Sequence, residues 1–129
     1  MSPNTQAASV SKGRLWAGWI LSVLAILPML SGGIMVLLKN PQVMQTFAKY
    51  GFPDSVIAPI GIIELVIVVL YVLPQTARFG GLIMLAHLGG ATATHVRFGE
   101  PFFLPIVVGI LAWVGLALRD RRTGDWIKG

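Results

Sequence analysis

The sequence contains no cysteine at any of its 129 positions. This excludes disulfide bonds, a thiol–disulfide relay, haem attachment through cysteine and cysteine-ligated iron–sulfur clusters. Charged residues are also scarce, at 12% of the chain, whereas a typical soluble domain carries about 25%. Because hydrophobic residues make up 55% of the chain, the composition indicates a protein whose main solvent is lipid.

Long apolar runs predict four membrane-spanning helices, at residues 15–38, 56–73, 79–95 and 102–118. The first run is far longer than the core of a signal peptide, which has about 7–15 residues, so we interpret it as a retained span. The predicted fold is therefore all-α: a membrane four-helix bundle over residues 15–118 with antiparallel up-down topology. Cytoplasmic tails are expected at residues 1–14 and 119–129.

The connection between the first two spans carries signals of its own. Asn40 is a suitable N-cap, Pro41 suits the first helical position, and Gly51 supplies a stop. Between them, Met44 and Phe47 fall on one side at helical spacing. We expect a short amphipathic helix on the membrane surface, which either only connects the spans or covers an outward-facing pocket.

Lysine and arginine are unequally divided between the two ends of such a bundle. The larger group consists of Lys12, Arg14, Arg78, Arg119, Arg121, Arg122 and Lys128, and the smaller of Lys39, Lys49 and Arg97. The positive-inside rule then places both termini in the cytoplasm, in a multi-pass protein of a bacterial-type inner membrane. Because these charges flank apolar runs, they favour contact with lipid headgroups and argue against nucleic-acid binding.

Glu64 lies inside the second expected span, where an ionisable side chain costs about 2.5–3.5 kcal/mol and usually faces a bundle interior or a wet cavity. It follows the outer start of its span by eight residues, and His87 precedes His95, at the outer end of the third span, by eight residues. Equal depth in antiparallel neighbours predicts that Glu64 and His87 meet.

Helical phase extends this pair into a polar seam. Tyr71 follows Glu64 at i+7, Thr94 follows His87 at i+7, and Arg97 lies at the outer mouth. The candidate ligand-binding or proton-relay residues are Glu64, Tyr71, His87, Thr94, His95 and Arg97. Such a seam passes protons or holds a ligand with a polar head and an apolar body, such as a quinone. The alternative is that Glu64 only fixes helix packing.

Small residues inside the expected spans are predicted to let helices approach closely. The helix-packing candidates are Gly32, Gly33, Gly61, Gly89 and Gly90. The sequence predicts no metal site, because its two histidines and lone intramembrane carboxylate form no ligand motif of known spacing. Haem is disfavoured, since both histidines lie on one expected helix and cannot clamp the same iron.

Residues 50–120 resemble the DoxX-like membrane proteins. The resemblance lies in G-x-x-E at residues 61–64, L-G-G-A-x-x-T-H-x-R at residues 88–97, and W-x-G-L-x-L-R-D at residues 113–120. It implies a four-span bundle, in agreement with the count of apolar runs. The family takes its name from a subunit associated with thiosulfate:quinone oxidoreductase in an archaeon. Many bacterial members are labelled redox components, while animal relatives look like assembly factors.

Two functions follow from these observations. The first is a redox accessory subunit that binds a quinone or another lipophilic ligand at an intramembrane Glu/His polar centre, with quinone as the candidate cofactor. In this hypothesis Glu64 and His95 are the head-group or proton ligands, and Arg97 lies at the entrance. The second is a non-enzymatic membrane scaffold or assembly partner, which binds a membrane protein or a second copy of the chain. The sequence names no catalytic residue, so it leaves both an enzymatic and a non-enzymatic role open.

Overall fold

The computed structural model describes residues 10–128, with side chains up to Asp125. These residues form helices α2 (Lys12–Leu37), α3 (Pro41–Lys49), α4 (Asp54–Val72), α5 (Ala77–Arg97), α6 (Phe103–Arg119) and α7 (Arg121–Lys128), and no strand. The all-α helical bundle is thereby confirmed. The four long helices begin and end within three residues of the expected spans.

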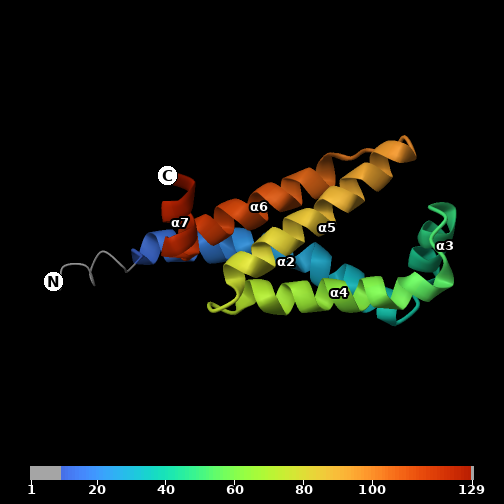
Figure 1. Cartoon of the computed structure of the whole chain (residues 1–129), viewed down its shortest axis with the longest axis horizontal. Coiled ribbons are helices and arrows are strands. Elements are labelled where there is room, and N and C mark those ends of the chain that lie inside the picture. Colours follow the sequence, from blue (N-terminus) through green and yellow to red (C-terminus); the bar gives the residue numbers. More distant parts are fainter. Residues whose placement is uncertain (1–9, 129) are drawn as a thin grey trace.

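The four long helices run alternately in opposite directions (Figure 1). α2 packs against α4 and α6, and α5 packs against the same two helices, so each long helix contacts two antiparallel neighbours in a closed ring. α3 lies across one end of this ring, which we call the α3 end. α7 packs on α6 at the opposite end, which we call the α7 end.

The bundle is packed most tightly toward the α7 end. Tyr71 and Leu116 are fully buried there. Glycines bring the helices together: a Cβ atom on Gly80 of α5 would lie 2.5 Å from the Tyr71 nitrogen, and one on Gly115 of α6 would lie 2.8 Å from the Ser22 nitrogen. Toward the α3 end, α5 and α6 diverge from α2 and α4 (Figure 1). The space for a site is therefore expected near the α3 end.

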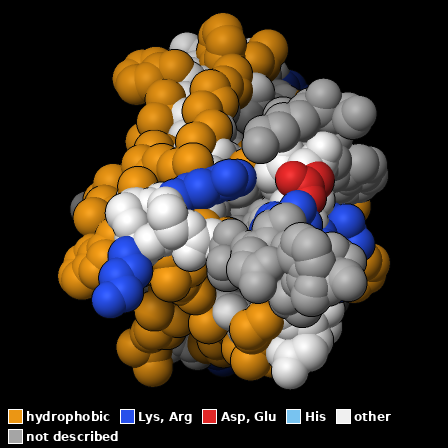
Figure 2. All heavy atoms as spheres, turned by 90° about the vertical axis from the view of Figure 1, so that its left-hand side faces the viewer, with side chains coloured by type: hydrophobic (Ala, Val, Ile, Leu, Met, Phe, Trp, Pro, Cys, Tyr) orange, Lys and Arg blue, Asp and Glu red, His pale blue; other side chains and the backbone are white. Residues whose placement is uncertain are grey.

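Apolar side chains cover the outside of the bundle. By length and composition, α2 and α4 can each cross a membrane, and α6 is a shorter apolar helix. Only 33% of the apolar stretch of α2 and 28% of that of α4 are buried within the chain. Figure 2 shows hydrophobic side chains around the bundle and lysine and arginine gathered at the α7 end. An exposed apolar surface of this extent is typical of a protein surrounded by lipid or partners.

The short amphipathic helix expected between the first two long helices is confirmed as α3. The Asn40 side chain accepts a hydrogen bond from the Val43 nitrogen at 3.2 Å, and Pro41 takes the first turn. Gly51 ends the segment with φ of +81°, a backbone conformation that glycine adopts without strain. Local sequence signals thus fix both ends of the helix that lies over the α3 end.

The charged segment after α6, which we expected only as a tail, forms helix α7. Asp120 caps it by accepting a hydrogen bond from the Thr123 nitrogen at 3.2 Å. Arg14 of α2 donates to the Ala117 and Leu118 carbonyl oxygens, which lie in the last turn of α6. Side-chain bonds therefore tie the start of α2 to the end of α6.

Candidate functional site

Glu64 of α4 and His87 of α5 lie face to face in the half of the bundle near the α3 end. Glu64 Oε1 is 3.0 Å from His87 Nε2, and their side chains are only 14% and 24% exposed. Gly32 of α2 leaves room for the carboxyl group, because a Cβ atom there would lie 3.0 Å from Glu64 Oε2. The structure therefore directs Glu64 toward α5, as its depth and helical phase predict.

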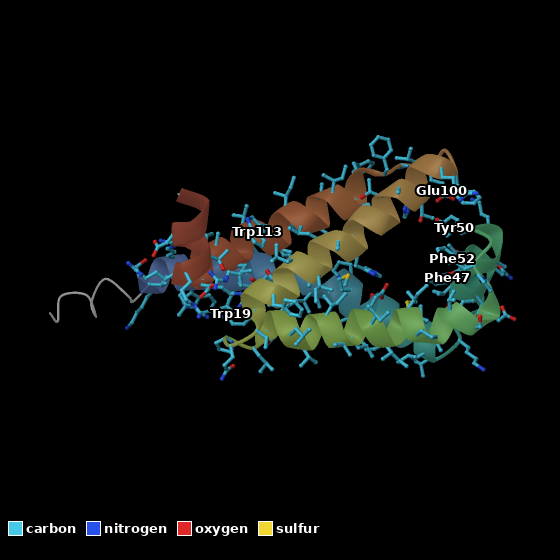
Figure 3. All side chains as sticks on the ribbon, viewed as in Figure 1. Trp19, Phe47, Tyr50, Phe52, Glu100 and Trp113 are labelled. Atoms are coloured by element: carbon cyan, nitrogen blue, oxygen red, sulfur yellow. The ribbon has the colours of Figure 1, made fainter. Side chains whose placement is uncertain are left out.

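A pocket of about 320 Å³ lies between α4, α5 and residues 41–52, and we call it the lateral pocket. We call residues 41–52, which contain α3 and the turn after it, the α3 segment. It is lined by Phe47, Tyr50, Phe52, Ile60, Glu64, His87, Gly90, Ala91, Thr94 and His95. One wall is aromatic and comes from the α3 segment, where Phe47, Tyr50 and Phe52 lie together (Figure 3). The other wall carries the polar groups. Volumes of about 300–1,000 Å³ are typical of small-molecule sites.

A second cavity of about 260 Å³ lies inside the ring of long helices, and we call it the inner chamber. Its walls come from all four long helices, with Met29 of α2 and Pro105 of α6 among its apolar lining. Glu64, His87 and His95 line both cavities. The polar pair therefore lies on the boundary between the lateral pocket and the inner chamber.

Two further polar side chains of α5 line the lateral pocket. His95 Nδ1 lies 2.7 Å from the Ala91 carbonyl oxygen, which only accepts hydrogen bonds, so Nδ1 carries the proton. In the neutral ring, Nε2 is then an acceptor for another group. Thr94 donates its hydroxyl proton to the Gly90 carbonyl oxygen at 2.9 Å. The site thus combines an acceptor at His95 with the hydrogen-bonded pair of Glu64 and His87.

The aromatic wall is tied to the loop between α5 and α6 by Glu100. Lys49 Nζ lies 2.5 Å from Glu100 Oε2, and the Tyr50 hydroxyl donates to Glu100 Oε1. These hydrogen bonds lower the pKa of Glu100, and the bond from Lys49 has the largest effect. Burial, together with the bond to Glu100, raises the pKa of Tyr50 to about 12. At neutral pH the carboxylate is charged and the phenol keeps its proton.

Sequence reasoning missed Tyr50 and Glu100 as site residues. They lie 50 residues apart in the chain, and neither belongs to a local motif. The Tyr50 ring also lies 6.1 Å from the His95 ring and 5.0 Å from the Phe98 ring, measured between ring centres. Only the fold brings these groups together, so no signal in the sequence identifies them.

Tyr71 is not part of the polar seam. Its hydroxyl donates to the Ala112 carbonyl oxygen and lies 3.1 Å from Ser22 Oγ, in the packed core near the α7 end. The i+7 spacing from Glu64 gives the right face of the helix, but at about 1.5 Å per residue it also moves the side chain about 10 Å along the axis. Helical phase alone was therefore not enough to predict the position of Tyr71, because the depth along the helix also has to match.

Three other expectations are corrected. Arg97 is exposed, with its guanidinium 5.9 Å from the Phe98 ring centre, and it lines neither the lateral pocket nor the inner chamber. Gly89 and Gly90 have no atom within 4 Å of the Cβ position, so neither packs against another described helix. Both glycines are exposed on α5.

The remaining glycine candidates lie where α2 contacts α4. A Cβ atom on Gly33 would lie 2.9 Å from a Leu65 side-chain atom, and one on Gly61 would lie 2.8 Å from a Val36 side-chain atom. With Gly32, which faces Glu64, they allow the close approach of α2 that holds the carboxyl group toward α5.

A second polar cluster lies near the α7 end and was not predicted. Arg119 Nε donates to Ser22 Oγ at 2.9 Å, and a second guanidinium nitrogen donates to the Tyr71 carbonyl oxygen. The guanidinium lies 4.2 Å from the Trp19 ring centre and 4.6 Å from that of Tyr71. Arg119 therefore joins α6 to α2 and α4 through side-chain contacts. The sequence indicated only its positive charge.

The structure defines a helical bundle with a polar pair between its helices and an apolar exterior. Comparison with known proteins agrees: the family model described as the DoxX-like family matches residues 20–116. The chain belongs to the DoxX-like family and is a membrane protein. A search of curated proteins and a search of solved structures each gave no match. The matched range includes Glu64, His87, His95 and the whole α3 segment.

Proposed function

We propose that the protein binds a small amphiphilic ligand, of which a quinone is the chemical class that fits best, and acts as a redox accessory subunit in the membrane. The observation that carries the proposal is the position of Glu64 and His87. They form one wall of a pocket whose opposite wall consists of the rings of Phe47, Tyr50 and Phe52.

The two walls match the two parts of a quinone. The flat ring of the ligand packs against the aromatic side chains of the α3 segment. A quinone oxygen accepts a hydrogen bond from His87 or from protonated Glu64, and a quinol hydroxyl donates to the acceptor nitrogen of His95. Reduction of a quinone to a quinol takes up two electrons and two protons. The polar pair supplies a route for the protons, and the electrons come from a redox partner.

We also propose that the four long helices span a bacterial-type inner membrane with the α7 end in the cytoplasm. The support is the distribution of basic residues: Lys12, Arg14, Arg78, Arg119, Arg121 and Arg122 belong to the α7 end, and Lys39, Lys49 and Arg97 to the α3 end. The lateral pocket then lies toward the outer face.

Native mass spectrometry of protein extracted in a lipid-like detergent tests the proposed function. The wild-type chain is expected to carry an extra mass that matches one membrane quinone, and Glu64→Gln is expected to lose most of it. Gln keeps the shape of Glu but has no acidic proton. A wild-type spectrum without bound quinone, from membranes that contain quinone, contradicts the proposal.

A scaffold role is the second candidate, and the outer face of α5 favours it. Gly89 is open there and lines an apolar groove of about 420 Å³ between α5 and α6 that includes Trp113. Open glycines on a lipid-facing helix are typical of helix association in membranes. The same mass spectra report the number of subunits. If copies of the chain associate through this face of α5, Gly89→Leu is expected to lower the fraction of oligomer.

A further inference from the structure

We propose that Glu100 is a positioning residue that latches the α3 segment over the lateral pocket, and that breaking this latch exposes the polar groups of the pocket to water at the α3 end. The inference deepens the proposed function, because it names the element that controls access to the same site. We call the rings of Phe47, Tyr50 and Phe52 the aromatic cover.

One carboxylate makes both contacts of the latch. Glu100 Oε2 pairs with Lys49, the last residue of α3, and Oε1 accepts from Tyr50, the next residue in the chain. Glu100 is itself fixed, because its backbone nitrogen donates to the His95 carbonyl oxygen at 2.9 Å, after Gly99 with φ of +67°. The latch thus joins the C-terminal end of α3 to the C-terminal end of α5.

The aromatic cover has little else to hold it. None of the nine residues of α3 is buried, so no packed core fixes the helix to the bundle. The ring contacts are with one another and with the end of α5: the ring centres of Phe47 and Phe52 lie 5.4 Å apart, and those of Tyr50 and Phe98 lie 5.0 Å apart. Segments with few buried contacts open at low free-energy cost. The two bonds to Glu100 therefore decide whether the cover stays in place.

The latch is more than an ordinary surface ion pair. An exposed Lys–Glu pair contributes little, because water and salt screen it. Here the same carboxylate also accepts from the partly buried Tyr50 hydroxyl, and hydrogen bonds to a charged group are stronger than neutral ones. Lys49, Tyr50 and His95 are the titratable groups that act on Glu100. Its lowered pKa agrees with a carboxylate held in its charged form.

The absence of cysteine allows a direct test. Thr94→Cys places one thiol in the lateral pocket, and a neutral, water-soluble maleimide measures how fast water-borne reagent reaches it. Glu100→Gln is expected to raise the labelling rate about threefold, because the ion pair is lost. Glu100→Ala also removes the acceptor for Tyr50, and we expect a rise of about tenfold. An Arg97→Cys reporter, exposed at the same end and outside the pocket, is expected to label at an unchanged rate in every background.

Charge reversal separates a latch from a general loss of structure. Lys49→Glu and Glu100→Lys are each expected to speed labelling of the Thr94→Cys reporter. The double variant is expected to label more slowly than either single variant but faster than the wild type, because it restores the ion pair and not the acceptor for Tyr50. Circular dichroism checks that the helix content is unchanged. Equal labelling rates in the wild type and Glu100→Ala overturn the proposal, and so does a double variant that labels as fast as the single ones. No ligand takes part, so the result is independent of whether Glu64→Gln loses its quinone.

Discussion

Glu64 and His87 meet across the contact between α4 and α5, with 3.0 Å between the carboxylate oxygen and the imidazole nitrogen, although 23 residues separate them in the chain. Each of the two side chains also borders both the lateral pocket and the inner chamber. This one contact therefore links the packing of α4 and α5 to both cavities.

Gly80→Ala is expected to lower the free energy of unfolding by about 1–3 kcal/mol, because the added methyl group would meet the backbone of α4, which cannot rotate away. Gly89→Ala is the matched control on the same helix. Its Cβ position is open, so we expect no loss and a gain of up to about 1 kcal/mol from helix propensity. Thermal unfolding in detergent, followed by circular dichroism, measures both. Equal effects contradict the described packing of α4 and α5.

Arg119→Gln is expected to destabilise the bundle by about 2 kcal/mol, because Ser22 and the Tyr71 carbonyl oxygen lose a charged donor. Arg122→Gln is the control: its closest acceptors lie 3.5 Å and 3.9 Å away at the surface, so its effect is expected near zero. Arg119→Gln and Ser22→Ala combined are expected to cost less than the sum of the two single changes. Additive costs show that the two side chains do not interact.

Tyr50 is expected to ionise near pH 12 instead of its usual value near 10. A raised folded-state pKa means that the contribution of the phenol is fully present below pH 10 and is lost as the pH rises through about 12. The ultraviolet absorbance of phenolate, taken as the difference between wild type and Tyr50→Phe, isolates this residue from Tyr71. A difference curve centred near pH 10 shows that Tyr50 does not donate to Glu100.

Titration of Glu100 weakens the latch as the pH falls, whereas titration of Tyr50 weakens it as the pH rises. The folded-state pKa of Glu100 lies below its usual value near 4.5, so the contribution of the latch is present above that value and is lost as the pH falls through the lower one. Because a maleimide reacts with the thiolate, whose fraction falls with pH, the labelling rate of Thr94→Cys is divided at each pH by that of the Arg97→Cys reporter. This ratio is expected to stay low from neutral pH down to about the usual pKa of Glu100 and to rise only in more acid solution. A rise in the ratio already at mildly acidic pH contradicts this order.

Single cysteines also test the orientation. Ser11→Cys lies at the start of α2, and Gln45→Cys lies on the exposed side of α3 at the other end of the bundle. In intact cells, a membrane-impermeant thiol reagent is expected to label Gln45→Cys and to reach Ser11→Cys only after lysis. The reverse pattern means that the orientation is opposite to the proposed one. Labelling of both positions before lysis means that the two ends of the bundle do not lie on opposite sides of the membrane.

Much of the fold is encoded locally and can be predicted. Asn40 and Pro41 start α3 through backbone chemistry that needs no tertiary contact. Depth along two antiparallel helices sufficed to pair Glu64 with His87, because both distances are counted from the same membrane face. Asp120 caps α7 in the same local way, although only a tail was expected there.

The rest of the site depends on contacts that a single sequence does not encode locally. Tyr71 shares the face of Glu64 but lies about two turns further along the helix, where Ser22 and Arg119 surround it. Glu100 reaches Lys49 and Tyr50 only because the α5–α6 loop returns to the end of α3. Gly89 faces outward because its place on α5 in the folded bundle, and not its own residue type, decides what it meets.

Binding of a quinone by variants of Glu64 tests the central claim most directly. Decylbenzoquinone is titrated by calorimetry into wild-type protein in lipid nanodiscs, and into Glu64→Gln and Arg97→Gln. We expect saturable binding to the wild type, an affinity about tenfold weaker for Glu64→Gln, and an unchanged affinity for Arg97→Gln. Glu64→Gln is expected to change stability by less than about 1 kcal/mol, since interhelical polar contacts in membranes are weak. Equal affinity in wild type and Glu64→Gln, or no saturable binding to either, contradicts the account.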